Sequence, residues 1–167
     1  RAFYACKSLK TIKIPSGITI IPDSCFYECS SLESVTIPEG VTAVGGDALR
    51  FCNFNALTLP ESLEKIGSHA FDGNKSLKSV NIPDSVTYIG NCAFRNCSSL
   101  AIITIPDNVT KIGTSAFENC MSLMHITIGR SVTEIETNGF YNCPKVTEII
   151  NKSKLDITPG PSDYGCP

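Results

Sequence analysis

The chain has 167 residues, enough for one domain with a real core, and its 42% hydrophobic and 18% charged residues are ordinary for a globular protein. Its formal net charge of −2 argues against a broad basic surface for nucleic acid or anionic lipid. No run of about 18 apolar residues occurs, so the sequence predicts no membrane insertion.

Three residue types recur along the chain at a nearly constant spacing. The first column, with steps of 23, 23, 22, 23, 23 and 23, is Phe3, Phe26, Leu49, Phe71, Phe94, Phe117 and Phe140. The second is Pro15, Pro38, Pro60, Pro83, Pro106 and Gly129. The third is Cys6, Cys29, Cys52, Asn74, Cys97, Cys120 and Cys143. A tandem period of this length predicts a solenoid.

Each unit reads L-x-x-V-x-I-P-x-x-V-T-x-I-G-x-x-A-F-x-x-C, and its elements follow in that order. In the copy from Leu77, "SVNIP" (79–83) alternates with period two, which predicts a short strand that Pro83 ends. "VTYIG" (86–90) predicts a second extended piece ended by glycine. "NCAFRNC" (91–97) is too short for a longer helix, so we expect one-turn or 3₁₀ pieces at most.

The pattern resembles the BspA-like, or Treponema-type, leucine-rich repeats. The resemblance rests on "IPDSVTYIGNCAF" (82–94), "IPDNVTKIGTSAF" (105–117) and the three columns, and it covers about residues 1–150. It implies a leucine-rich-repeat solenoid of about six to seven rungs, mainly short β-strands and turns. The departures are Leu49, Asn74, Gly129 and Glu136. After Val146 the sequence no longer follows the repeat consensus, so we expect residues 151–167 to form a C-terminal cap or tail.

Members of this family are often adhesins, so the resemblance implies a non-catalytic module at the cell surface or secreted, without a cofactor. Its partner would be a protein of the extracellular-matrix or cell-surface type. The alternative is a spacer solenoid that presents another domain. The chain starts within a copy of the phrase, at "RAFYAC" (1–6), so we expect it to be cropped there. An open end near Phe3 would favour end-to-end self-association.

Nine cysteines raise the alternatives of a disulfide framework or a zinc site. The repeat already accounts for six of them, and a free cysteine packs as a small hydrophobic residue. No C-x-x-C motif occurs, and the odd count disfavours a complete framework. We therefore predict a buried, reduced cysteine column and no metal site.

One column combines groups that could perform chemistry. Two residues before each phenylalanine, Asp47, His69 and Cys92 follow one another on neighbouring units. They could supply a carboxylate, a base and a thiol, or three metal ligands. No oxyanion donor or fourth ligand is evident, so the favoured interpretation is a variable, solvent-facing column. A Cys/His-dependent enzyme is the remote alternative.

The outward columns of the first strand are mostly polar, as expected of an exposed β-surface. Two adjacent units depart from this pattern at Ala101, Ile102, Met124 and His125. Because a clustered exposed apolar patch can mark a contact site, these residues are the candidate protein-binding face. Across the rod, Tyr88 lies between Lys65 and Lys111 in another column and is a further candidate.

Overall fold

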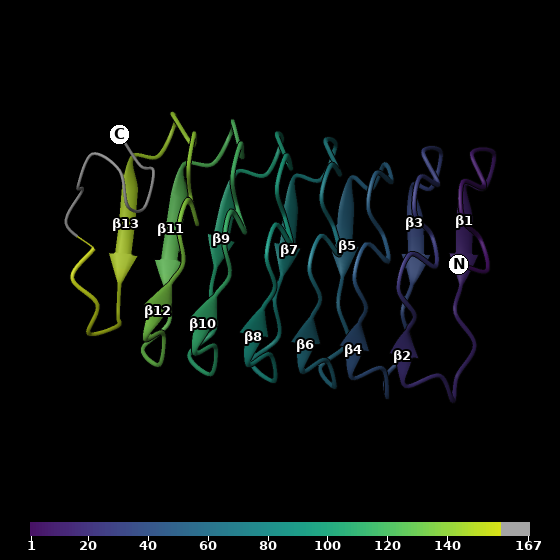
Figure 1. Ribbon diagram of the computed structural model, residues 1–167, viewed down its shortest axis with the longest axis horizontal. Coiled ribbons are helices and arrows are strands. Elements are labelled where there is room, and N and C mark those ends of the chain that lie inside the picture. Colours follow the sequence, from purple (N-terminus) through teal and green to yellow (C-terminus); the bar gives the residue numbers. More distant parts are fainter. Residues whose placement is uncertain (158–167) are drawn as a thin grey trace.

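The computed structural model describes residues 1–157 as a solenoid of parallel β-strands (Figure 1). Each turn of about 23 residues, here called a rung, contributes one strand to each of two faces. The odd-strand face holds β1 (Thr11–Lys13), β3 (Ser34–Thr36), β5 (Ala56–Thr58), β7 (Ser79–Asn81), β9 (Ile102–Thr104), β11 (His125–Ile128) and β13 (Glu148–Asn151). The even-strand face holds β2 (Ile20–Ile21), β4 (Ala43–Val44), β6 (Lys65–Ile66), β8 (Tyr88–Ile89), β10 (Lys111–Ile112) and β12 (Glu134–Ile135).

Every strand pairs in parallel with at least one strand of a neighbouring rung. The even strands form a single sheet in the order β12-β10-β8-β6-β4-β2. The odd strands form three sheets, β1-β3, β5-β7 and β13-β11-β9. Ile102 pairs with His125, as the 23-residue period requires, whereas Ala43 pairs with Lys65 across the shorter step. The predicted leucine-rich-repeat solenoid is confirmed.

The consensus glycine that follows β4, β6, β8 and β10 permits neighbouring rungs to approach closely. A Cβ atom added at Gly67 would lie 2.8 Å from the Val44 carbonyl oxygen, and one at Gly90 would lie 2.6 Å from the Gly67 carbonyl carbon. Such distances leave no room for a side chain unless the backbone shifts. The glycine column therefore reflects close stacking.

The corner that carries the consensus phenylalanine is a series of turns, and residues 1–157 contain no helix. The backbone is left-handed two residues before and two residues after the phenylalanine, for example at Cys92 (φ 55°) and Asn96 (φ 59°). A left-handed residue interrupts a right-handed helical turn, so the corner does not exceed the expected limit of one-turn or 3₁₀ pieces. Asparagine at 96, 119 and 142 suits this conformation because it tolerates the left-handed region better than most residues.

Stacked phenylalanine rings run through the core. Phe94 lies between Phe71 and Phe117, with ring centroids 5.2 and 5.3 Å away, and Phe140 continues the stack at 5.1 Å from Phe117. Leu49 interrupts the column while remaining fully buried. The inward side chains of both faces complete one hydrophobic core along the length of the rod.

The cysteine column forms a ladder of hydrogen bonds between rungs. Each buried thiol donates to the carbonyl oxygen of the phenylalanine 26 residues earlier, as Cys97 does to Phe71 at 3.4 Å and Cys143 to Phe117 at 3.3 Å. Asn74 fits the column because its Nδ2 donates to the Leu49 carbonyl at 2.9 Å. The eight cysteines within residues 1–157 are free thiols, while Cys166 lies outside the described residues.

After β13 the chain folds back onto the last rung. The Lys152 amide donates to the Ile128 carbonyl at 2.9 Å, and Leu155 and Ile157 pack against the core. The rest of the expected tail, residues 158–167, lies outside the described residues. Within residues 1–157, no helix has the length and apolarity that crossing a membrane requires.

We expect Phe94→Ala to lower the free energy of unfolding by about 3–5 kcal/mol, because it removes a fully buried ring that stacks on both sides. Phe3→Ala is the matched control, since Phe3 stacks on Phe26 alone and is 40% exposed. Its loss should be less than half as large. Urea unfolding followed by circular dichroism measures both, and equal losses would contradict a stacked core.

Candidate functional site

The structure brings four of the predicted binding residues together on the odd-strand face. Ile102 on β9 is 54% exposed and pairs with His125 on β11. Met124, just before β11, is 39% exposed, and its amide donates to the Ala101 carbonyl at 2.8 Å. The four residues, which we call the apolar patch, therefore occupy adjacent positions on two neighbouring rungs.

Met121 is a further exposed apolar residue, which the sequence analysis missed. It lies in the turn before β11, on the same rung as Met124, and is 40% exposed. A signal was present, because the other members of its column up to that point are polar: Lys7, Ser30, Asn53, Lys75 and Ser98. The column lies in a turn, and the alternating pattern predicts exposure only for strand residues. The exposure of Met121 therefore could not be predicted from that pattern.

A polar interaction lies at the edge of the apolar patch. His125 Nδ1 lies 3.1 Å from Glu148 Oε2 on β13, and both side chains are exposed. Large exposed hydrophobic side chains otherwise occur only toward the two ends of the described chain, and none lies between residues 21 and 101. The patch therefore lies where a long polar stretch ends, and exposed Ile149 and Ile150 follow it on β13.

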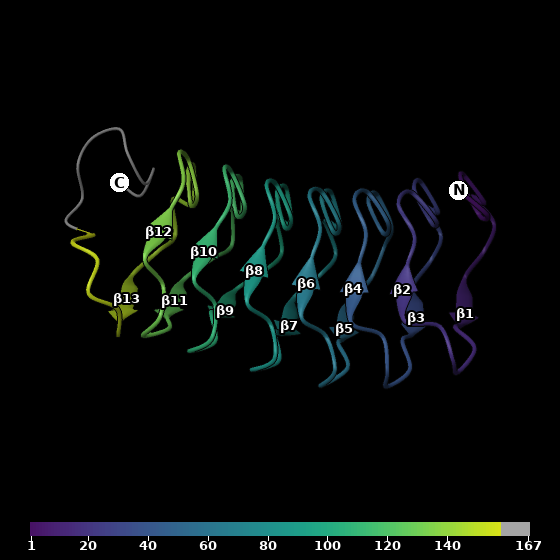
Figure 2. The ribbon, with the colours of Figure 1, turned by 60° about the horizontal axis from the view of Figure 1, so that its bottom comes forward.

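Tyr88 does not join the patch. It lies on β8 of the even-strand face, paired with Lys65 on β6 and Lys111 on β10, as its column predicted. Figure 2 shows the even strands in a row separate from the odd strands. Lys111 is held by Glu136 and Glu134, with Nζ–oxygen distances of 2.5 and 3.3 Å. Tyr88 and the apolar patch are thus separate surfaces, and one small ligand could not contact both.

The residues of the suspected catalytic column have other partners. His69 Nδ1 lies 3.2 Å from Asp72, and Asp47 accepts a hydrogen bond from Arg50 at 2.9 Å. Burial raises the pKa of the Cys92 thiol, which makes the nucleophilic thiolate scarcer. The column is also not wholly solvent-facing, because Cys92 and Ser115 are buried. Its members share a left-handed backbone, and their positions provide no activated nucleophile.

Asp72 is the centre of a buried charge cluster that the sequence analysis did not find. Its fully buried carboxylate accepts from Arg95 and from Asn96, each at 2.9 Å. Arg50 Nε lies 3.0 Å away as an ion pair. The pKa of Arg95 is raised, chiefly by its hydrogen bond to this carboxylate. With its oxygens occupied, Asp72 is a structural anchor between rungs rather than a reactive group.

We expect Asp72→Asn to lower the free energy of unfolding by up to about 3 kcal/mol, because it leaves partly buried arginines without a counter-charge. The value lies at the lower end of the usual range because both arginines keep some access to water. Asp84→Asn, at an exposed position 12 residues along the chain, is the control and should change stability little. Urea unfolding would show this difference, and equal effects would refute the structural role of Asp72.

The raised pKa and burial of Cys92 predict slow alkylation in the folded protein. Cys6, in the first rung, is only partly buried and should be the first of the eight cysteines within residues 1–157 to react with iodoacetamide at neutral pH. Peptide mapping by mass spectrometry gives the order of labelling. Preferential labelling of Cys92 would contradict an unreactive thiol and support the enzymatic alternative.

Comparison with known proteins agrees with this geometry. A leucine-rich repeat protein of T. pallidum is 26% identical, with a TM-score of 0.65 over 92% of this chain and 61% of its own. A leucine-rich repeat protein from Eubacterium ventriosum has a TM-score of 0.71 at 19% identity, over 96% of this chain and 48% of its own. A leucine-rich cell surface protein from Faecalibacterium prausnitzii has 0.54 at 22% identity, over 93% and 62%.

The chain thus spans less than two thirds of the length of each of these structures. No curated protein matches the sequence significantly. The family model described as the BspA type leucine rich repeat region, in contrast, matches six copies over residues 1–97 and 65–160. The chain belongs to the BspA-type leucine-rich repeat family.

Proposed function

We propose that the protein is a non-catalytic binding module, at the cell surface or secreted, that adheres to a protein ligand through its apolar patch. The observation that carries this proposal is Ile102, more than half exposed on a strand and adjacent to Met124, on a face where β3, β5 and β7 carry no large exposed hydrophobic side chain. An isoleucine in this position adds nothing to the core, since Ile103 fills the inward position of β9. Its exposure is accounted for if a partner covers it.

The patch has properties that suit protein recognition. Ile102 sits on a strand paired on one side with β11, so little conformational freedom is lost when it is covered. Methionine side chains at 121 and 124 can adjust to the shape of an apolar partner surface. The exposed pair of His125 and Glu148 provides a polar border, as protein interfaces usually have.

The family and its relatives support the location and partner class. The repeat family favours a protein-binding or structural role, and the Faecalibacterium prausnitzii relative is described as a cell surface protein. We therefore place this chain at the cell surface or outside the cell, with a protein of the extracellular-matrix or cell-surface type as ligand. Binding would depend on shape and apolar burial, without a cofactor.

The test is binding of the protein to immobilised extracellular-matrix and serum proteins at physiological salt. Ile102→Asp and Met124→Asp should each weaken saturable binding at least about tenfold, since a buried charge without a partner is strongly unfavourable. Ser79→Asp and Asn55→Asp, in the same two columns on other rungs, are the matched controls. Circular dichroism verifies that every variant remains folded.

Equal binding by all four variants would indicate that the ligand binds another face, and it would refute the role of the patch. Absence of binding across the panel would favour the alternative of a spacer that holds another domain at a distance.

A further inference from the structure

The apolar patch lies between two charges of opposite sign. Lys78 precedes Ala101 in the column just before the odd strands, and Glu148 follows His125 in the next column. Both charged residues are exposed, and Lys78 forms no ion pair within residues 1–157. From β7 to β13, the odd-strand face therefore runs from a cation through the apolar patch to a carboxylate.

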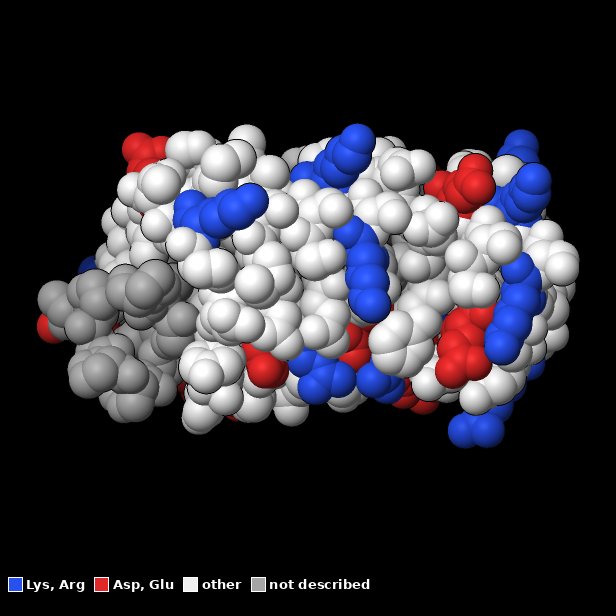
Figure 3. All heavy atoms as spheres, turned by 90° about the horizontal axis from the view of Figure 1, so that it is seen from above, with Lys and Arg blue, Asp and Glu red and all other residues white. Residues whose placement is uncertain are grey.

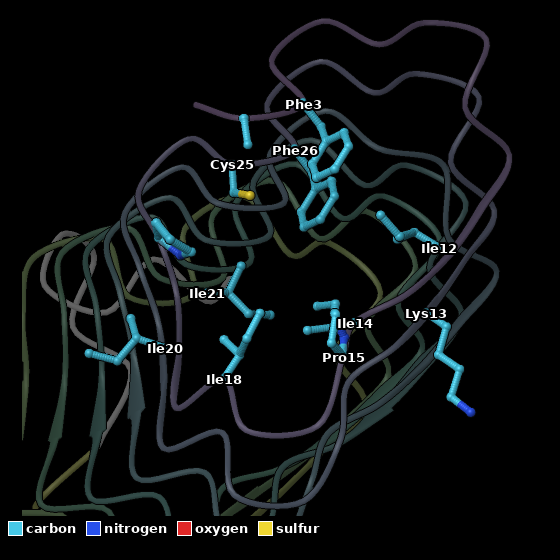
Figure 4. Close-up of a pocket in the computed structure, with 12 residues that line it drawn as sticks. Phe3, Ile12, Lys13, Ile14, Pro15, Ile18, Ile20, Ile21, Cys25 and Phe26 are labelled. Atoms are coloured by element: carbon cyan, nitrogen blue, oxygen red, sulfur yellow. The ribbon is translucent and has the colours of Figure 1, made fainter.

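The side chains of these columns point away from the core. Successive residues of a strand point to opposite sides, as Figure 4 shows at β1, where Ile12 and Ile14 point into the rod and Lys13 points out. Ile103 and Ile126 fill the corresponding inward positions beneath the patch. A partner on this face therefore meets only the outward columns.

Single charges, rather than a broad field of one sign, orient a partner here. Figure 3 shows charged side chains of both signs scattered among uncharged ones on the side of the rod viewed there. Among the strand residues and the residue before each strand, from β7 to β13, only Lys78 and Glu148 carry a full charge at neutral pH. The Glu148 carboxylate contacts His125 through Oε2 alone within the described residues, which leaves Oε1 for a partner.

This order of charges distinguishes two ways in which a second copy of the chain could meet the face. In a symmetric pair of identical faces, each position meets its symmetry-related position. With parallel rods, Lys78 would lie against Lys78 and Glu148 against Glu148. With antiparallel rods and the two-fold axis between β9 and β11, the rung of Lys78 lies against the rung of Glu148. Opposite charges then meet at both ends of the contact, which favours the antiparallel pair.

The antiparallel arrangement also pairs the apolar side chains. The rung of β9 then faces the rung of β11 of the other copy, so Ala101 lies against Met124 and Ile102 lies over His125. A methionine side chain adjusts readily to the surface that it covers. The patch is therefore complementary to itself, as an interface between identical copies requires.

We infer that the partner of the apolar patch is a second copy of this chain, bound face to face with its rod antiparallel. The inference deepens the proposed function and rests on it, because the apolar patch is again the contact surface. Rods that project from two facing cells run in opposite directions. An antiparallel contact therefore joins copies on different cells.

The contact is small, so a single pair of copies is held weakly. Its four rungs span about 15 Å along the rod and are one short strand wide. A stable complex usually buries about 800 Å² on each partner, which is more than this area provides. Many such contacts acting at once can still hold two surfaces together.

Self-association of the protein alone tests the inference, by sedimentation equilibrium under reducing conditions at up to about 0.5 mM protein. We expect a reversible dimer with a dissociation constant of about 10–500 μM, weaker at high salt because screening reduces charge attraction. Lys78→Glu and Glu148→Lys should each weaken dimerisation at least about tenfold, because each brings like charges together. Lys65→Glu and Glu64→Lys, the same charge changes on the even-strand side, are the matched controls and should leave dimerisation unchanged.

The double variant Lys78→Glu with Glu148→Lys identifies the orientation. In the antiparallel pair it restores opposite charges at both ends, so its dimerisation should return close to that of the original protein. In a parallel pair it would leave like charges together. Ile102→Asp should remove dimerisation, since it buries a charge without a partner. Circular dichroism verifies that each variant is folded.

The outcomes separate this inference from the proposed function. A protein that stays monomeric over this concentration range would overturn the inference, while binding to a panel protein through Ile102 and Met124 would leave the proposed function standing. Dimerisation that survives both single charge changes, or a double variant as weak as the single ones, would also overturn it. Dimerisation that Ile102→Asp removes, without binding to any panel protein, would support a second copy as the partner.

Discussion

The structure depends on one constraint, the backbone hydrogen bonds that tie each rung to its neighbours. At the phenylalanine corner the amides donate forward, as Phe94 does to the Ala116 carbonyl at 2.8 Å, while at the even strands they donate backward, as Gly113 does to Ile89 at 2.9 Å. Because these bonds fix the translation from rung to rung, residues of one column become neighbours in space. The phenylalanine stack and the thiol ladder are consequences of that translation.

The same constraint divides the side chains into two groups with different freedom. Inward columns accept few residues, because every substitution meets the rung above and the rung below. Outward columns lie in solvent, so a residue such as Ile102 can appear there without disturbing the core. The outward columns are therefore the ones in which a binding surface could arise without cost to the core. Asp72 is an exception, because it is a charged residue at a fully buried position. It can be buried there because Arg50, Arg95 and Asn96 provide its ion-pair and hydrogen-bond partners.

Sequence columns predicted the period, the strand register and the exposure of Ile102 and Met124, because all three follow directly from translation along the rod. They could not predict contacts made within a corner. His69 meets Asp72 and Asp47 meets Arg50 three residues away along the chain, because the left-handed residues fold the corner tightly. The sequence analysis compared only neighbouring rungs, so it grouped His69 with Asp47, whereas His69 lies beside Asp72. It also did not identify the buried cluster around Asp72.

The stacking register of a chain of near-identical repeats is ambiguous, since each repeat could stack on several others. Pairing displaced by one full period would still match valine with valine and phenylalanine with phenylalanine. The region around Asp72 removes this ambiguity, because its rung follows the one short step and carries the only carboxylate flanked by arginines on both adjacent rungs. A displaced stack would bury that carboxylate without its counter-ions. The charge cluster thus favours the native stacking register of the rungs over registers displaced by one full period.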